Sequence, residues 1–335
     1  MLRGCYTRAG RGGNAAIAPT AHAIVSIEKL TKVYAGKQRV VAVDAIDLAI
    51  PEGGIFGLLG PNGAGKTTTI SICTTRALPT SGRVVIAGHS AASEPAVTRR
   101  FIGVVPQYNT LDRSLTAFEN LYFHCRYFGM SRSVATARAT ELLEQFRLTE
   151  RAQAMPNQLS GGLAQRLLVG RAIAHRPAVL FLDEPSAGLD PQSRLAMWEV
   201  VRGLKDQGIT VMLTTHYMEE AEALCDRVAI IDHGKILIEG TPDELKSSLQ
   251  IQTVFGLELE RPGERENLAV TVRQIPHVSS VETTASGVRV FGKSAEGILP
   301  ALVTAAQPYG LRDLSISGPT LETVFITLTG RDLRE

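Results

Sequence analysis

The chain has 335 residues, which is longer than one typical domain, so the length predicts a main domain with a smaller one attached. Its 35 Lys and Arg residues nearly balance its 33 Asp and Glu residues, and the formal net charge is +2. This balance provides no general attraction to nucleic acid or to an anionic membrane. We therefore expect no nucleic-acid partner, and we expect any acidic ligand to be bound locally.

Residues 1–22 are basic and contain no acidic side chain and no continuous apolar segment. We predict a disordered N-terminal extension, although a targeting peptide or a start codon assigned too early would look similar. The four cysteines are scattered and form no Cys-x-x-Cys pair, which disfavours a disulfide framework or a zinc site and favours a reducing cytoplasm. No apolar run approaches the roughly 20 residues of a membrane-spanning helix, so we expect that the chain does not cross a membrane alone.

The next part of the chain, residues 23–249, alternates strand-like and helix-like patterns. Helices are predicted over 117–128 and 134–146, and strands over 24–34, 40–50, 55–60, 83–88, 101–107, 178–184, 209–216 and 227–240. Strands interleaved with helices predict an α/β domain with a mostly parallel sheet.

A smaller unit is predicted over residues 250–335. It begins with a strand at 253–260, a helix from Glu264 and a hairpin at 278–292. A helix at 295–310, a strand at 311–317 and a closing helix from Leu321 follow. The order βαββαβ suggests a small α+β domain of the ferredoxin-like kind.

One motif predicts a phosphate-binding loop. The sequence "GPNGAGKT" matches G-x-x-x-x-G-K-[ST] directly after the strand expected at 55–60. In such a loop the backbone N–H groups surround the phosphates, Lys66 reaches the β and γ phosphates, and the Thr67 hydroxyl binds Mg²⁺. The predicted nucleotide-binding residues of the loop are Gly60, Pro61, Asn62, Gly63, Ala64, Gly65, Lys66, Thr67 and Thr68.

A phosphate loop needs a carboxylate for its metal ion, and "VLFLDEP" at 179–185 supplies one at the end of an apolar strand. We predict that Asp183 holds Mg²⁺ through water. Successive strand residues point in opposite directions, so Glu184 would face elsewhere and act as the general base towards an attacking water.

Three further residues are weaker candidates on their own. His216 follows the apolar strand "VMLTT", at the strand end where α/β sheets place ligand contacts, so it is either a ligand or a packed residue. Gln107 ends another strand and suits a water or metal contact. Tyr34 lies near the end of an amphipathic strand, where an aromatic residue usually belongs to the core or its rim.

A second anion site is predicted at "QLSGGLAQRL", residues 158–167. Ser160, Gly161 and Gly162 open a helix there, and the free N–H groups of a helix start favour an anion.

The ordered set "GPNGAGKTT", Gln107, "LSGG", "LFLDEP", "SAGLD" and His216 resembles the ATP-binding subunit of ABC transporters over residues 24–249. The resemblance implies an ABC cassette with a helical signature region, ATP and Mg²⁺ as cofactors, and ATP hydrolysis. It further implies that Tyr34 stacks on adenine, Gln107 senses the membrane partner, Asp190 belongs to the D-loop, and His216 holds the γ-phosphate.

The resemblance also accounts for two phosphate-binding elements in one chain. In that family the "LSGG" of one subunit closes over the γ-phosphate bound by the other, so the working unit is a head-to-tail pair with a second copy or a paralogous ATPase. The chain departs from the family at Leu163, where the usual signature continues with Gln. This departure affects the geometry expected after the turn, while Ser160 to Gly162 are intact.

Two segments, 102–131 and 320–335, look like those of ABC-2 exporter ATPases of the drug-resistance and nodulation-type lipo-oligosaccharide kinds. This resemblance implies export of an amphipathic substrate through a separate integral-membrane ABC-2 permease. The subunit would then lie at the cytoplasmic face of the cell membrane, attached through that permease.

Three other functions fit the sequence less well. A soluble ABC ATPase acting on ribosomes or DNA typically has two fused cassettes or a coiled-coil insertion, whereas this chain has one cassette and no heptad run. A phosphate-loop kinase would have no use for "LSGG" and "SAGLD". A binding module without hydrolysis is opposed by the intact Lys66, Asp183 and Glu184.

Overall fold

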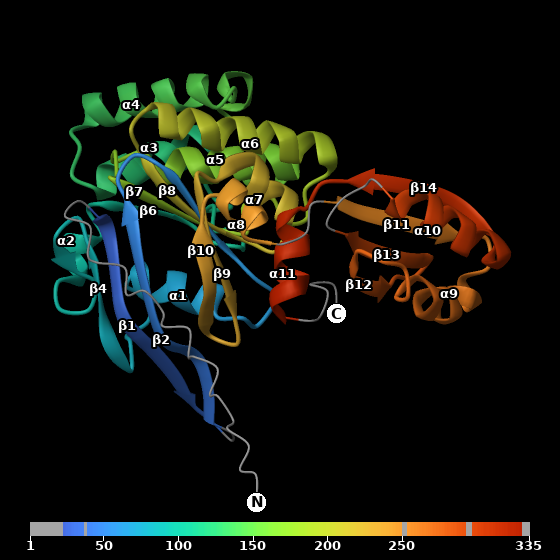
Figure 1. Ribbon diagram of the computed structural model, residues 1–335. Coiled ribbons are helices and arrows are strands. Elements are labelled where there is room, and N and C mark those ends of the chain that lie inside the picture. The colour runs from blue at the N-terminus through green and yellow to red at the C-terminus, as the bar shows by residue number, and fades with distance from the viewer. Residues whose placement is uncertain (1–22, 37–38, 250–252, 293–296, 330–335) are drawn as a thin grey trace, which may run out of the picture.

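The computed structural model describes residues 23–36, 39–249, 253–292 and 297–329 (Figure 1). The extension expected at 1–22 lies outside these ranges. Within the described residues, none of the helices combines the length and the apolar character that crossing a bilayer requires.

The main α/β domain is built on a six-stranded sheet in the order β10-β9-β3-β8-β7-β6. Neighbouring strands are parallel except at the edge, where β10 pairs antiparallel with β9. The strands are β3 Ile55–Leu59, β6 Ile102–Val105, β7 Val179–Asp183, β8 Thr210–Thr215, β9 Arg227–Asp232 and β10 Lys235–Gly240. The predicted parallel sheet is therefore confirmed.

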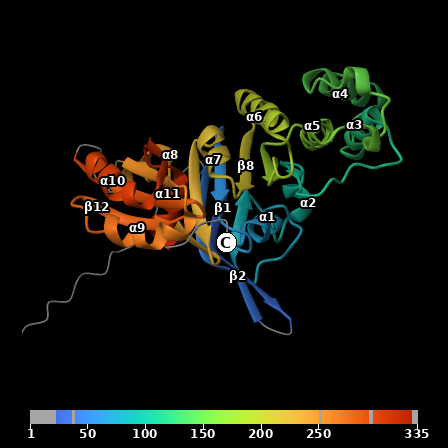
Figure 2. The same ribbon diagram turned by 90° about the vertical axis from the view of Figure 1, so that its right-hand side faces the viewer.

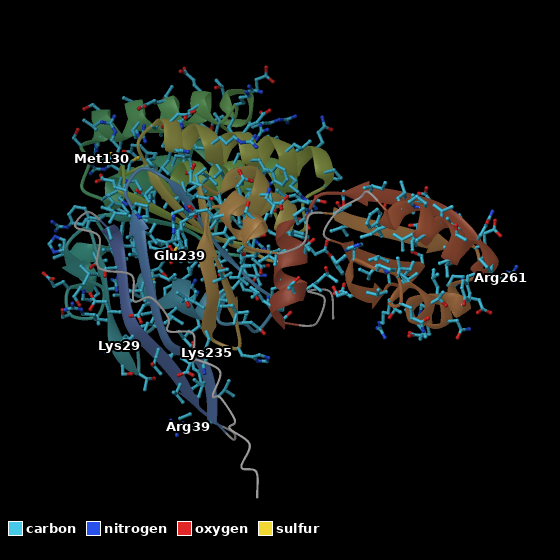
Figure 3. All side chains as sticks on the ribbon, viewed as in Figure 1. Lys29, Arg39, Met130, Lys235, Glu239 and Arg261 are labelled. Atoms are coloured by element: carbon cyan, nitrogen blue, oxygen red, sulfur yellow. The ribbon has the colours of Figure 1, made fainter. Side chains whose placement is uncertain are left out.

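A second sheet holds the first two strands and is antiparallel, in the order β2-β1-β4-β5. Its strands are β1 Ala23–Ala35, β2 Arg39–Pro51, β4 Ser81–Ile86 and β5 His89–Ser90. Apolar side chains of β1 and β2 form a layer with the six-stranded sheet and α1 Lys66–Cys73. Figure 3 shows Arg39 towards the outer end of the β1–β2 hairpin, away from this core.

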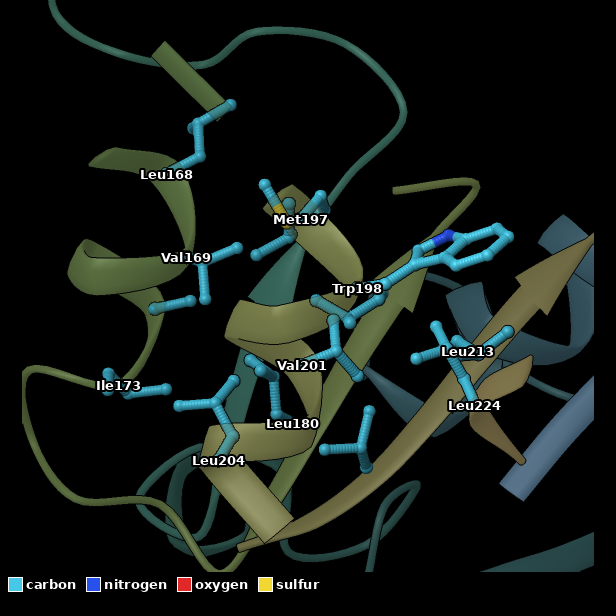
Figure 4. Close-up of a cluster of buried hydrophobic side chains, with 14 of the residues drawn as sticks. Leu168, Val169, Ile173, Leu180, Met197, Trp198, Val201, Leu204, Leu213 and Leu224 are labelled. Atoms are coloured by element: carbon cyan, nitrogen blue, oxygen red, sulfur yellow. The ribbon is translucent and has the colours of Figure 1, made fainter. Parts of the chain in front are cut away.

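Helices cover the other face of the six-stranded sheet. They are α5 Gly161–Ala172, α6 Pro191–Asp206 and α7 Met218–Leu224. Helices α3 Ala117–Tyr127 and α4 Arg132–Gln145 pack on each other and on α5, farther from the sheet (Figure 2), while α2 Pro95–Thr98 lies beside β5 and α8 Pro242–Ser248 beside β10. A large buried cluster joins them to the sheet, and Figure 4 shows Val201 and Leu204 of α6 against Leu180 of β7. Several of these helices start at a side-chain cap, which fixes where their N-termini lie.

The C-terminal part forms its own four-stranded antiparallel sheet, in the order β12-β13-β11-β14. Two helices, α9 Arg265–Val272 and α10 Ile298–Ala306, lie along it and share its buried core, and Arg261 lies at the end farthest from the main domain (Figure 3). The strands are β11 Thr253–Leu259, β12 Val278–Thr283, β13 Gly287–Gly292 and β14 Leu311–Ser317. This is the βαββαβ order that the sequence predicts.

The last described helix, α11 Leu321–Thr329, packs on the main domain rather than on the small sheet (Figures 1 and 2). Leu321, Val324 and Phe325 are fully buried, and they belong to the same hydrophobic cluster as the apolar side chains of α7. The backbone N–H of Leu321 donates a 2.7 Å hydrogen bond to the Glu222 carboxylate on α7. The small domain is thus followed by a segment that returns to the cassette.

Candidate functional site

The phosphate loop lies between β3 and α1 and depends on three glycines. Gly63 and Gly65 have positive φ angles, +82° and +111°, which side chains of L-residues rarely adopt. A Cβ on Gly60 would lie 2.1 Å from the carbonyl oxygen of Ile231, and one on Gly65 would lie 2.4 Å from that of Ala42. The loop therefore packs so closely on its neighbours that only glycine fits at Gly60 and Gly65.

Lys66, the first residue of α1, points back across the loop. Its ammonium donates hydrogen bonds to the carbonyl oxygens of Gly60 at 2.7 Å and Pro61 at 3.1 Å, and only 4% of the residue is exposed. Burial lowers the pKa of Lys66, and the carboxylate of Glu184, 3.5 Å away, opposes this shift. The ammonium is held where the phosphates of a nucleotide would meet it.

Asp183 and Thr67 face one another, as the motifs predict. The Thr67 hydroxyl donates to Asp183 Oδ1 at 3.2 Å, and the Thr214 hydroxyl donates to the same oxygen at 2.7 Å. Sequence reasoning missed Thr214, although it belongs to the "LTTH" segment that contains His216. Hydroxyl and carboxylate oxygens are hard ligands that suit Mg²⁺, which usually completes its coordination with water and phosphate oxygens.

Glu184 turns towards Lys66 for a different reason from the one the sequence suggested. Strand β7 ends at Asp183, and Glu184 follows it with φ +51°, a left-handed conformation. The change of direction comes from this backbone turn and not from alternation along a strand.

The Glu184 carboxylate is the point where three predicted residues meet. Its Oε1 lies 3.5 Å from Lys66 Nζ and 3.3 Å from His216 Nδ1, and its Oε2 accepts a 3.2 Å hydrogen bond from Gln107 Nε2. The short distance to His216 lacks the alignment of a hydrogen bond. Two side chains that follow strands, Gln107 and His216, and one that starts a helix, Lys66, are thus assembled around this carboxylate.

A pocket opens at this assembly, with the phosphate loop as its floor. Its lining residues are Ala42, Pro61, Asn62, Gly63, Gly65, Lys66, Thr67, Thr68, Gln107 and Glu184. Backbone N–H groups, a buried cation and a hydroxyl are the donors and ligands that a chain of phosphates with Mg²⁺ needs. Ala42 carries no side-chain chemistry and has no signal in the sequence.

Tyr34 does not line this pocket. It lies on β1 with 45% of its surface exposed, and the Lys32 ammonium is 5.0 Å from the centroid of its ring. Its exposed aromatic face is available for stacking, but the structure places it outside the phosphate assembly.

Ser160, Gly161, Gly162 and Asp190 lie at two neighbouring helix starts. Ser160 Oγ accepts a 3.4 Å hydrogen bond from the N–H of Leu163, and Asp190 Oδ1 accepts one of 3.0 Å from the N–H of Ser193. These starts touch, because a Cβ on Gly162 would lie 2.9 Å from Ser193 Oγ. Among the residues described, none from α5 lines the pocket at Lys66.

Leu163, the departure from the usual signature, is half-buried and packs against the helical core of the main domain. Its side chain therefore contributes to packing just after the turn.

Residues 43–187 match the family model described as "ABC transporter". The chain is 39% identical over 316 residues to the linearmycin resistance ATP-binding protein LnrL of Bacillus subtilis, covering 93% of this chain and 100% of that protein. It therefore belongs to the ABC transporter ATP-binding proteins, and it is an ATPase of that family.

Other relatives narrow the group. The daunorubicin/doxorubicin resistance ATP-binding protein DrrA of Streptomyces peucetius is 40% identical over 90% of this chain and 91% of its own. The Nod factor export ATP-binding protein I of Ralstonia nicotianae is 38% identical, and the alignment covers 93% of this chain and 95% of that protein. These relatives confirm the resemblance to exporter-type ATPases.

Solved structures agree with the fold. The dimeric ATP-binding cassette MJ0796 bound to ADP and Pi has a TM-score of 0.60 and 30% identity, covering 65% of this chain and 98% of that one. The ATP binding subunit of an ABC transporter likewise gives a TM-score of 0.60 at 29% identity, covering 67% of this chain and 92% of that one.

Proposed function

We propose that the protein hydrolyses Mg-ATP to power export of an amphipathic substrate through a separate integral-membrane permease of the ABC-2 type. The observation that carries the proposal is the convergence of Lys66, Gln107 and His216 on the Glu184 carboxylate beside the phosphate loop. A kinase would need a second pocket for its acceptor, and "LSGG" would have no role in it.

Each residue has a distinct role in this proposal. Lys66 and the loop N–H groups bind the β and γ phosphates. Thr67, and Asp183 through water, would hold Mg²⁺, and the ion would supply positive charge against the phosphates. Glu184 accepts the proton of the attacking water. Gln107 and His216 orient that water and the γ-phosphate from the two sides of Glu184.

The partner of the site is a second ATPase subunit, either another copy or a paralogue, arranged head to tail. Ser160, Gly161 and Gly162 start α5 with free backbone N–H groups, and within the described chain they do not line the pocket at Lys66. They are placed to bind the γ-phosphate held by the partner, and Asp190 starts the neighbouring helix at the same contact.

The export function rests on the relatives. Their names specify resistance to linearmycin and to daunorubicin or doxorubicin, and export of Nod factor. These names support an amphipathic cargo, a permease partner and a location at the cytoplasmic face of the membrane. Tyr34, with its exposed ring, is the residue proposed to stack on adenine.

The first experiment tests the pair and the base together. Glu184→Gln removes the carboxylate that accepts the proton but keeps the shape of the side chain. We expect this variant to bind Mg-ATP without turnover and to elute as a dimer with Mg-ATP and as a monomer with Mg-ADP. Undiminished hydrolysis would remove Glu184 from its role as base.

A second experiment tests sharing between subunits by mixing two inactive variants, Lys66→Ala and Ser160→Arg. A mixed dimer contains one intact site, built from the loop of the Ser160→Arg subunit and the "LSGG" of the other. Recovery of ATPase activity on mixing supports a shared site. Mixed dimers that form without recovering activity count against a shared site, provided that one intact site can turn over alone. A mixed dimer of wild-type and Lys66→Ala subunits, which also has one intact site, tests that condition.

The permease is tested by first reading the genes that neighbour the one for this chain, and then co-expressing the chain with any multi-span membrane protein that they encode. We expect ATPase activity to co-purify with that membrane protein and to respond to amphipathic compounds. Binding of the purified subunit alone to protein-free liposomes would contradict attachment through a permease.

A further inference from the structure

A buried carboxylate lies on α7, the helix that follows the loop of His216. Glu220 on α7 is 0% exposed, and its Oε1 accepts a 3.1 Å hydrogen bond from the indole N–H of Trp198 on α6. Figure 4 shows the Trp198 ring reaching from α6 towards Leu213 of β8. Glu220 thus joins α6 to α7 beneath the loop that carries the histidine.

The second oxygen of this carboxylate is not satisfied. Glu220 Oε2 and the hydroxyl of Ser186 are both buried without a hydrogen-bond partner among the described residues. Burial raises the pKa of Glu220, whereas the nearby hydroxyls of Thr215 and Ser186 lower it. The Ser186 hydroxyl is thus close enough to Glu220 to lower its pKa, yet neither this hydroxyl nor Oε2 takes part in a hydrogen bond of normal geometry among the described residues.

On one side Glu220 supports the switch loop, defined here as residues 215–217. The Thr215 hydroxyl, which lies close to Glu220, accepts a 2.9 Å hydrogen bond from the N–H of Tyr217. The Tyr217 ring packs against His216 at 4.1 Å between centroids, and the Arg194 guanidinium lies 4.8 Å from the centroid of the Tyr217 ring. Glu220 therefore lies next to the hydroxyl that binds the backbone N–H directly after His216.

On the other side Glu220 supports the D-loop, residues 186–190. Ser186 begins this loop two residues after Glu184, and Asp190 ends it as the cap of α6. Trp198, two turns further along α6, donates to Glu220. The same carboxylate therefore lies beside Ser186, the first residue of the D-loop, and is hydrogen-bonded to Trp198 on the helix that Asp190 caps.

We infer that Glu220 is a positioning residue that couples the D-loop to the switch loop, by accepting a hydrogen bond from Ser186 when the site closes on ATP. Buried polar groups are nearly always paired, so a facing donor and acceptor left unpaired in the separate subunit favour a state in which they meet. Hydrogen bonds to a carboxylate are stronger than those between neutral groups, so forming this bond in a dry site favours the closed arrangement. Glu220 is fully buried and does not line the pocket at Lys66, so it acts through His216 and the D-loop.

The first test is Ser186→Ala. The hydroxyl has no partner in the separate subunit, so we expect the midpoint of thermal unfolding to stay within about 3 °C of wild type. We expect kcat to fall at least about tenfold with KM for ATP changed less than about threefold, because the bond forms only on closure. A residue that merely stabilised the fold would move the melting midpoint and leave kcat unchanged.

The second test is a double-mutant cycle with Glu220→Gln. The amide keeps one acceptor oxygen for Trp198, and its nitrogen cannot accept the Ser186 proton. If the two residues form one bond, the double variant loses no more kcat than either single variant. Glu219→Gln is the matched control, because it makes the same charge change at an exposed position of α7 and should behave as wild type.

Three results would overturn the inference: a wild-type kcat for Ser186→Ala, losses that multiply in the double variant, or an equal loss in Glu219→Gln. Because the inference rests on the proposed role of His216, His216→Ala is measured in parallel. If His216→Ala hydrolyses ATP normally, the proposed function of that residue fails. If His216→Ala is inactive while Ser186→Ala is not impaired, the coupling alone is wrong.

Discussion

The return of α11 to the cassette can be tested by removing one side chain. Phe325 is fully buried and packs in the cluster that includes Leu321, Val324 and the helices of the main domain. Phe325→Ala removes a ring that packs between α11 and the helices of the main domain. The cavity that results lies inside the cassette core and not in the small C-terminal sheet.

The magnitude follows from burial. Replacing a buried Phe by Ala typically costs about 3–5 kcal/mol of stability. For a domain of the cassette's size each kcal/mol shifts the melting midpoint by about 2–4 °C, so the expected loss is about 6–20 °C. This variant and its control are both made in the Glu184→Gln background, where Mg-ATP raises the melting midpoint of the cassette and so identifies its thermal transition. Phe325→Ala should lower the midpoint of that transition.

Leu328→Ala is the control, since Leu328 lies on the same helix and 43% of it is exposed. It should shift the ATP-sensitive transition by less than about 2 °C, in keeping with surface substitutions. Equal midpoints for the two variants would refute the packing of α11 into the cassette. A shift confined to an ATP-insensitive transition would place the helix with the small domain instead.

Three further outcomes are expected at the nucleotide site. Lys66→Ala should abolish turnover and weaken ATP binding, as measured with a fluorescent nucleotide, because it removes the cation held over the loop. Gly65→Ala should also prevent binding, since its Cβ would lie 2.4 Å from the Ala42 oxygen, whereas Gly203→Ala, where the added methyl meets open space, should bind normally. Thr214→Val removes the 2.7 Å hydrogen bond to Asp183, so half-maximal activity should need about tenfold more Mg²⁺, while Thr214→Ser should keep the wild-type requirement.

The parts of the site that the sequence predicts are those where chemistry and local structure coincide. In the phosphate loop a short segment needs glycines for its turns and also carries Lys66 and Thr67, so one motif specifies both. Asp183 is similar, because a carboxylate at the end of a fully apolar strand is costly to bury unless it binds a cation or a hydrogen-bond donor. These predictions need no knowledge of which strands are neighbours.

Other parts depend on contacts between distant segments, which a single sequence does not reveal. Thr214 supports Asp183 from a strand 31 residues further along the chain, and Glu222 pairs with Leu321 across 99 residues. Alternation along β1 and β2 predicts strands, but it does not show that they leave the parallel sheet for an antiparallel one. The left-handed turn at Glu184 gives no signal either, because that conformation is unusual for Glu.

Helix α7 connects two features that the sequence does not link. Its Glu220 accepts a hydrogen bond from Trp198 of α6, and its Glu222 accepts one from the start of α11. Since α7 has only seven residues and follows the switch loop directly, it cannot shift at one end without moving the other. A helix that comes after the small C-terminal domain is therefore attached to the element that positions His216. The small domain is thus linked to the cassette through α11, whose first backbone N–H is bound by the helix that directly follows the switch loop.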